Sequence, residues 1–99
     1  MLFAFSVAPT VSSEPDGSVG PAVAAAIDVV RKSGLPYRTD AMFTTLEGEW
    51  DECMAVIKRA CDVVSAHSSR VSLVVKADIR PGYTDQLDAK VTRVNDLLD

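Results

Sequence analysis

The sequence is poor in the residues that most often build catalytic centres. Its 99 residues contain one histidine and two cysteines. Because His67 is the only histidine, one chain can form neither a zinc site with two histidine ligands nor a catalytic triad with a second histidine. The sequence also has no complete glycine-rich phosphate or dinucleotide motif. We therefore expect no metal site, no cofactor and no catalytic residue, and interpret the chain as a non-enzyme.

Positive charge is scarce as well. Ten basic residues stand against fourteen acidic ones, for a net charge of −4. Nucleic-acid binding needs a positive surface to neutralise phosphates, so we expect no nucleic-acid partner. No apolar run approaches the ~20 residues of a membrane span, and Ser6 and Pro9 interrupt the apolar start before it resembles a secretory signal. We expect neither a membrane segment nor a signal.

The two cysteines, Cys53 and Cys61, fall in one helical pattern eight residues apart. At ~1.5 Å rise per residue their Cα atoms lie ~12 Å apart, beyond the ~7 Å limit for a disulfide. Two reduced core thiols are typical of a cytoplasmic protein, which is the location we predict.

The length and the 47% hydrophobic content fit one compact domain over residues 1–99. This composition excludes intrinsic disorder, collagen, coiled coils and disulfide-rich scaffolds. Alternating and helical apolar patterns predict the following elements. Strands are expected at 2–8, 35–39, 42–47 and 70–80, and helices at 19–33, from about 49–51 to the connector at 67–69, and after Thr84.

The ends of these elements carry turn and capping residues. Ser18 is a predicted N-cap of the first helix, and Gly34 its left-handed C-terminal residue. Thr84 is the predicted cap of the last helix, whose apolar face is Leu87, Val91, Val94 and Leu98.

The element order is βαββαβ with an additional C-terminal helix. This order predicts an α+β, ferredoxin-like fold, in which helices cover one face of a four-stranded antiparallel sheet. The apolar row from Val71 to Ile79 should face the helices. The opposite face would carry Leu2, Ala4, Ser6 and Ala8 beside Ser72, Val74, Lys76, Asp78 and Arg80. Such a half-apolar surface is typical of an interface, so we expect a second subunit to cover it in a homodimer or homotetramer.

The segment from Met42 to Glu52 contains the most informative cluster of acids. Asp51 and Glu52 suit the N-terminus of a helix without any functional reason. Glu47 ends a strand before Gly48, and its carboxylate could hold a cationic or amino-bearing ligand. It could equally form a structural ion pair with Lys76 or Arg80, and the residues alone leave both readings open.

Several short pieces occur together in a characteristic order. They are Ser6-Val7 with Pro9, Ser33-Gly34-Leu35 with Tyr37, Met42 with Thr44, Glu47-Gly48-Glu49 with Asp51, and Lys76, Asp78 and Arg80. In this respect the chain resembles the small ferredoxin-like thiamine-binding proteins related to YkoF, over nearly its whole length. Ala41 and Phe43 depart from the family pattern, which often has proline and a small residue at these positions.

The resemblance implies non-catalytic binding of thiamine, or its hydroxymethylpyrimidine moiety, by a soluble oligomeric carrier or sensor. A site for thiamine needs a carboxylate, hydroxyl groups and an aromatic wall. The expected ligand-binding residues are Ser6, Phe43, Thr44, Glu47, Trp50 and Arg80. Strand alternation places Thr44 and Glu47 on opposite faces of the sheet. The alternative function is a structural or regulatory homo-oligomerisation module with no small-molecule ligand.

Overall fold

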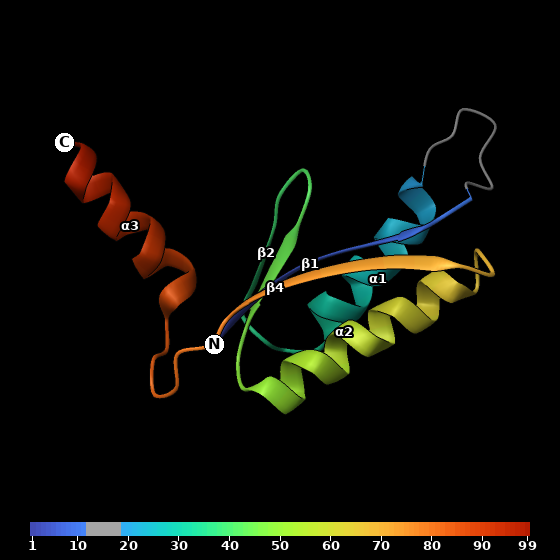
Figure 1. Ribbon diagram of the computed structural model, residues 1–99, viewed down its shortest axis with the longest axis horizontal. Helices are drawn as coiled ribbons and strands as arrows, with labels where there is room; N and C mark the ends of the chain where they lie inside the picture. Colours follow the sequence, from blue (N-terminus) through green and yellow to red (C-terminus); the bar gives the residue numbers. More distant parts are fainter. Residues whose placement is uncertain (12–18) are drawn as a thin grey trace.

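A computed structural model describes residues 1–11 and 19–99 of the chain, which form four strands and three helices (Figure 1). Residues 12–18 lie outside this description, and the predicted N-cap at Ser18 lies among them. The elements in chain order are β1 (Leu2–Pro9), α1 (Gly20–Lys32), β2 (Tyr37–Thr39), β3 (Thr44–Glu47), α2 (Trp50–Ser65), β4 (Val71–Asp78) and α3 (Gln86–Leu98).

The strands form one antiparallel sheet in the order β2-β3-β1-β4. Helices α1 and α2 lie together on one face of this sheet, while α3 leaves the sheet on its own (Figure 1). The two central strands pair with Phe3 opposite Leu46, and β1 pairs with β4 along its whole length. This arrangement confirms the predicted α+β, ferredoxin-like fold with an additional C-terminal helix.

Strict alternation along β1 builds the core. Phe3, Phe5, Val7 and Pro9 are buried beneath the helices, and the intervening residues are only half-buried on the open face of the sheet. Apolar residues at helical spacing meet them from the other side. These are Ala22, Ala26 and Val30 of α1, and Cys53, Val56, Ile57, Ala60 and Val64 of α2. Burial of this row fixes which face of the sheet the helices cover.

The ends of α1 and α2 follow local rules. Gly34 has φ +80°, as its predicted role at the end of α1 requires. Helix α2 begins with a reciprocal capping box between Glu49 and Glu52, and the Glu49 backbone N–H donates to Glu52 Oε1 at 2.8 Å. A Cβ at Gly48 would lie 2.6 Å from that same oxygen, so a larger residue here would displace the Glu52 side chain from the cap.

Some details of the sequence prediction are wrong. Strand β2 begins at Tyr37, two residues later than expected. Strand β3 begins only at Thr44, because residues 40–43 form the hairpin turn, closed by a hydrogen bond from Asp40 N to Phe43 O at 2.9 Å. The row from Val71 to Ile79 is only partly covered, since Leu73 is 42% exposed and Ile79 is 58% exposed. Strand β4 lies at the edge of the sheet, where the two helices scarcely reach it.

The start of α3 also differs from the prediction. Its N-cap is Asp85, in a left-handed conformation with φ 59°, and Thr84 offers only its carbonyl, which accepts a hydrogen bond from the Gln86 side chain. None of the residues of α3 is buried. No helix among the described residues is long and apolar enough to cross a membrane.

Candidate functional site

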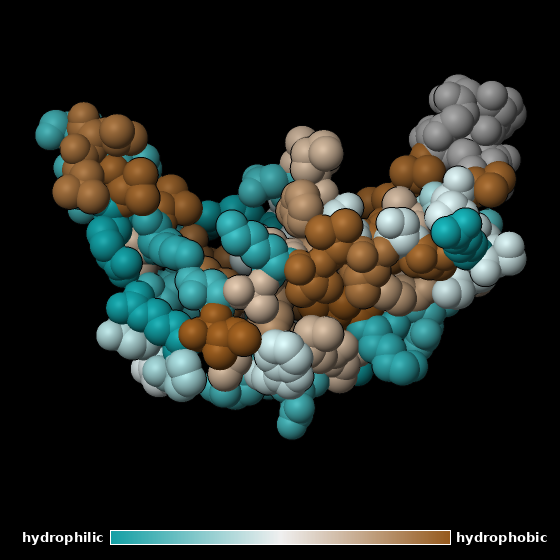
Figure 2. All heavy atoms as spheres, viewed as in Figure 1, coloured by the Kyte–Doolittle hydropathy of each residue, from teal (hydrophilic) through white to brown (hydrophobic). Residues whose placement is uncertain are grey.

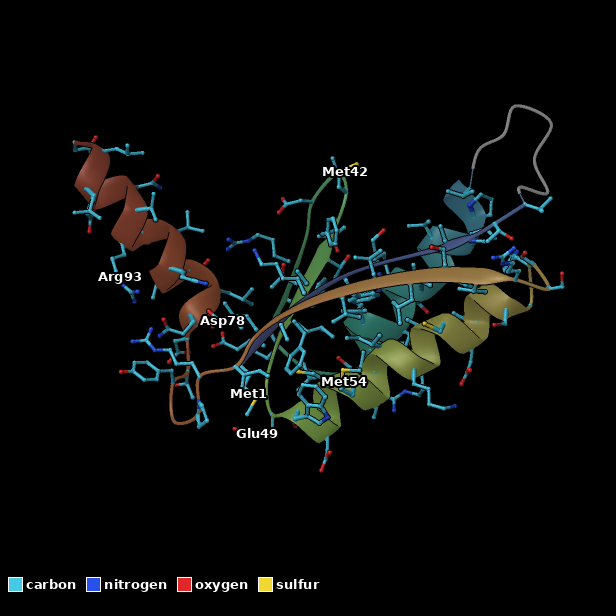
Figure 3. The ribbon with its side chains drawn as sticks, in the orientation of Figure 1. Met1, Met42, Glu49, Met54, Asp78 and Arg93 are labelled. Atoms are coloured by element: carbon cyan, nitrogen blue, oxygen red, sulfur yellow. The ribbon has the colours of Figure 1, made fainter. Side chains whose placement is uncertain are left out.

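Three of the six expected ligand-binding residues meet at one end of the sheet. Ser6, Phe43 and Thr44 line a hollow of about 240 Å³ between β1, α1 and the β2–β3 hairpin, which we call the hairpin pocket. Met42 marks the tip of this hairpin in Figure 3. The remaining lining residues are Phe5, Val7, Ala8, Val19, Val23, Ala26, Ile27, Thr39, Asp40, Ala41 and Met42.

The pocket exists because β1 extends past β3. Pairing between these strands ends where Phe5 faces Thr44, and β1 continues for four more residues to Pro9. Over that stretch no described strand pairs with β1 on the β3 side. Ser6 and Thr44 belong to opposite faces of the sheet, because Thr44 pairs with the buried Phe5, yet both reach the pocket because it opens at this notch.

The polar groups of the pocket come mainly from the hairpin. Thr44 is buried, and its Oγ1 lies 3.1 Å from Oγ1 of Thr39 across the β2–β3 pair. Asp40 adds a carboxylate to the lining. Sequence reasoning missed Thr39 and Asp40, because a threonine in a strand and an aspartate in a tight turn each have an ordinary structural explanation.

The other three expected residues lie at the opposite end of β3. Trp50 is the first residue of α2, and its ring meets Phe3 edge to face with 5.6 Å between the centroids. Arg80 follows β4, and its guanidinium lies 3.5 Å from the centre of the Tyr83 ring. Glu47 ends β3. The six residues therefore form two groups of three, one at each end of β3. Only the first group, which includes Thr44, lies in the hairpin pocket.

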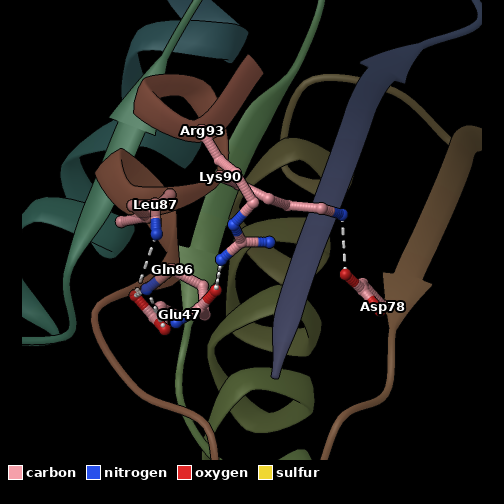
Figure 4. Close-up of polar contacts among 6 residues, drawn as sticks. All are labelled: Glu47, Asp78, Gln86, Leu87, Lys90 and Arg93. Carbon is pink, nitrogen blue, oxygen red and sulfur yellow. Dashed lines mark hydrogen bonds and ion pairs between the residues drawn. The ribbon is translucent and has the colours of Figure 1, made fainter. Parts of the chain in front are cut away.

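Glu47 has a role that differs from both interpretations of the sequence, which were a ligand-binding carboxylate and a structural ion pair. Its side chain is buried at 7% exposure, and its carboxylate accepts hydrogen bonds from the backbone N–H of Gln86 at 2.8 Å and of Leu87 at 3.3 Å (Figure 4). Glu47 thus caps the N-terminus of α3, where unpaired amides and the helix dipole favour a negative charge. The expected ion pair with Lys76 or Arg80 is not formed.

Two ion pairs complete the attachment of α3. Lys90 Nζ lies 2.7 Å from Asp78 Oδ2 at the end of β4, and Arg38 of β2 pairs with Asp88 (Figure 4 shows the first). The hydrogen bond from Lys90, together with its charge, holds the pKa of the Asp78 carboxyl below its ordinary value. The first turn of α3 is therefore fixed to three strands.

Neither cysteine is activated. Burial raises the pKa of the Cys53 thiol to about 11, and the nearby charge of Glu52 adds to the effect. Burial likewise raises the pKa of Cys61. Both residues are free cysteines, as their spacing predicted, and both stay protonated at neutral pH. Among the residues that the structure describes, no three His, Cys, Asp or Glu side chains are grouped to hold a metal ion.

A family model described as "Thiamine-binding protein" matches residues 3–95, which is nearly the whole chain. The chain belongs to this family. The match confirms the resemblance to the YkoF-related thiamine-binding proteins and covers both groups of expected site residues.

Other proteins resemble this member of the thiamine-binding protein family in sequence and in fold. UPF0045 protein Mb1933 of Mycobacterium bovis is 53% identical over 95 residues, which cover 95% of this chain and 90% of the relative. The crystal structure of protein MJ1052 from Methanocaldococcus jannaschii superposes with a TM-score of 0.84 at 30% identity, over 95% of this chain and 94% of that one.

A third similarity concerns a Thermotoga maritima protein that has been proposed to act in thiamine biosynthesis or salvage. Its crystal structure matches with a TM-score of 0.76 at 25% identity, covering 93% of this chain and 97% of that one. The match covers nearly the whole of both chains.

Proposed function

We propose that this protein binds thiamine or its hydroxymethylpyrimidine moiety without converting it, and acts as an oligomeric carrier or sensor. The observation that supports this proposal is the meeting of Ser6, Phe43 and Thr44 in one pocket of a thiamine-binding family member. The family assignment suggests a thiamine-related ligand, and the pocket offers the groups that such a ligand needs. A cytoplasmic location stays a prediction.

The chemistry of the hairpin pocket suits an aminopyrimidine. Phe43 and the buried Phe5 supply aromatic walls, while the hydroxyls of Thr44 and Ser6 can hydrogen-bond ring nitrogens. The Asp40 carboxylate can accept from the exocyclic amino group, and it also brings negative charge toward a cationic thiazolium. A mostly apolar pocket with a few placed polar groups is the usual form of a small-molecule site.

The size of the pocket favours the smaller ligand. Sites for drug-sized molecules usually enclose about 300–1,000 Å³. The hairpin pocket has about 240 Å³, so it suits the pyrimidine moiety better than the whole of thiamine. We therefore expect hydroxymethylpyrimidine to occupy the pocket, and the thiazolium of thiamine to extend past the rim beside Met42.

Calorimetric titration tests this proposal. Saturable binding of hydroxymethylpyrimidine or thiamine is expected for the natural sequence, and mass spectrometry should recover the ligand unchanged. Phe43→Ala should weaken binding about tenfold, since an aromatic contact of ~1.4 kcal/mol corresponds to a factor of ten. Trp50→Ala is the matched control, because Trp50 is an exposed aromatic residue at the other end of the sheet.

The remaining outcomes have distinct meanings. If Trp50→Ala and Glu47→Gln weaken binding while Phe43→Ala does not, the site lies at the opposite end of β3, around the second group of expected residues. If millimolar ligand gives no heat, the binding function is wrong and the alternative of an oligomerisation module without a ligand takes its place. A chemically altered ligand would contradict the non-catalytic role.

A further inference from the structure

The hairpin pocket has one charged side chain among the described residues that line it, and this is Asp40. The Asp40 side chain is exposed, and none of the other described residues forms a hydrogen bond or an ion pair with its carboxylate. Glu47, the acid that the sequence predicted for the site, is already bound to the amides of α3. The Asp40 carboxylate is therefore available to contact a ligand in the pocket.

The backbone holds Asp40 at the rim of the pocket. Its N–H donates to the Phe43 carbonyl at 2.9 Å and closes the turn between β2 and β3. The preceding residue, Thr39, pairs with Thr44 in the sheet. Figure 2 shows moderately apolar atoms at the projecting tip of this hairpin, where Figure 3 marks Met42. Because Met42 is 77% exposed on the same turn, Asp40 lies at the open side of the pocket.

The inner part of the pocket differs from this rim. Phe5, Ala26 and Thr44 are almost completely buried there. The Thr44 hydroxyl lies 3.1 Å from the Thr39 hydroxyl, and either oxygen can be the donor. A hydroxyl both donates and accepts, so this pair can bind a ring nitrogen with or without a proton. The ionised carboxylate of Asp40, in contrast, can only accept hydrogen bonds.

The connectivity of the proposed ligand matches this division of the pocket. In hydroxymethylpyrimidine the amino group and the hydroxymethyl group are on adjacent ring atoms. In thiamine the hydroxymethyl carbon bears the thiazolium, which we expect to extend past the rim beside Met42. The amino group then also lies near the rim, while the rest of the ring enters the buried part. An amino donor is thus brought to the side of the pocket where Asp40 can only accept.

We infer that Asp40 determines the specificity of the hairpin pocket, and that it selects pyrimidines with this amino group over analogues that carry an oxo group in its place. The inference deepens the proposed function and rests on it. The amino group donates a hydrogen bond to the carboxylate. The oxo group has only lone pairs, so it leaves the carboxylate unpaired and is repelled by its charge.

The threonine hydroxyls do not contribute to this selection. In the oxo analogue the ring nitrogen beside the oxo group carries a proton, whereas in the amino form it is an acceptor. The hydroxyl pair of Thr39 and Thr44 can meet either form by reversing its donor and acceptor. The choice between the two ligands therefore depends on Asp40.

Calorimetric titration of the full chain with two ligands tests this inference. The ligands are hydroxymethylpyrimidine and its oxo analogue. Both are uncharged at mildly alkaline pH, so attraction between Asp40 and a thiazolium has no part in the result. The natural sequence should bind the amino form about 10–100-fold more tightly, because only this form donates a hydrogen bond to the charged carboxylate.

Asp40→Asn should remove most of this preference. Asparagine has the shape of aspartate and suits a turn, and its amide can either accept from the amino group or donate to the oxo group. The ratio of the two Kd values should therefore fall about tenfold. Asp62→Asn is the matched control, since it makes the same change of charge at an exposed carboxylate of α2 outside the pocket lining, and it should leave the ratio unchanged.

Thr44→Val separates affinity from selection. It removes a buried hydroxyl that can serve both ligands, so it should weaken both by similar factors and leave their ratio nearly unchanged. Circular dichroism checks that each variant is folded. A loss of preference in Thr44→Val as large as that in Asp40→Asn would show that the hydroxyl pair selects the ligand, and would overturn the role of Asp40.

The other outcomes separate this specificity from the proposed function. Equal binding of the two ligands, or an unchanged ratio in folded Asp40→Asn, overturns the role of Asp40 and leaves the binding function intact. A changed ratio in Asp62→Asn attributes the selection to net charge and overturns it as well. Loss of both ligands in folded Asp40→Asn would show that Asp40 supports the whole pocket instead of selecting its ligand. If the natural sequence binds neither ligand, the proposed function is wrong and the inference is wrong with it.

Discussion

Helices α2 and α3 carry the same kind of apolar stripe but have different surroundings. Helix α2 buries five side chains, including Ile57 at 1% exposure, against the sheet and α1. Helix α3 buries none, and Val91 and Val94 on its stripe are at least half exposed. Each stripe shows that its helix has an apolar side. Whether that side is buried depends on whether the helix packs against the sheet.

The two helices also differ in how they are anchored. Helix α2 is capped by its own residues, Glu49 and Glu52, and packs along its whole length. Helix α3 is capped by Glu47 from a distant strand and is held mainly through its first turns. An isolated helix of 13 residues is only marginally stable in water, so α3 depends on this attachment far more than α2 does on its cap.

The largest expected contrast between the helices is in core packing. Ile57→Ala in α2 should lower the free energy of unfolding by about 2–5 kcal/mol, since it removes a fully buried side chain. Val94→Ala in α3 should cost less than about 1 kcal/mol, because Val94 is exposed. Urea denaturation measures both. Equal losses would mean that α3 is packed as tightly as α2.

A smaller contrast concerns the caps. Glu47→Ala removes the acceptor for the Gln86 and Leu87 amides and should destabilise the first turn of α3 by about 1 kcal/mol. Hydrogen exchange should then accelerate about fivefold in α3 alone. Glu52→Ala removes the equivalent group in α2. Because α2 unfolds only together with the core, the loss of the Glu52 cap should lower the free energy of global unfolding. Uniform acceleration after Glu47→Ala would contradict local attachment.

Much of the fold could be predicted from the sequence because its signals are local. The alternation in β1, the helical stripe of α2 and the glycine after α1 each reflect a preference of the chain over a few residues. The burial of β4 could not be predicted in the same way. Leu73 and Ile79 alternate as well as Phe3 and Phe5 do, but β4 lies at the sheet edge, and edge position depends on pairing between distant strands.

The sequence predicted which residues belong to the site better than it predicted how they are arranged. Ser6, Phe43 and Thr44 were expected together and share a pocket, because the notch between β1 and β3 joins both faces of the sheet. The partners of Glu47 depend on where α3 attaches, forty residues along the chain. No local pattern encodes that contact. Asp40 was not predicted as a site residue, because an aspartate in a tight turn has an ordinary structural explanation.

The smallest expected effect lies at the other anchor of α3, where Lys90 pairs with Asp78. The pair lowers the pKa of the Asp78 carboxyl, so its contribution to the attachment of α3 is present above the unfolded pKa and is lost as pH falls through the lower folded value. Because both side chains are about half exposed, the effect should be visible in an NMR titration of Asp78 and not in global stability. Lys90→Ala should return the Asp78 pKa toward its ordinary value. Lys58→Ala, which breaks an exposed pair within α2, is the matched control and should leave the Asp78 titration unchanged. An unchanged Asp78 titration in Lys90→Ala would show that the first turns of α3 are held by Glu47 and Arg38 alone.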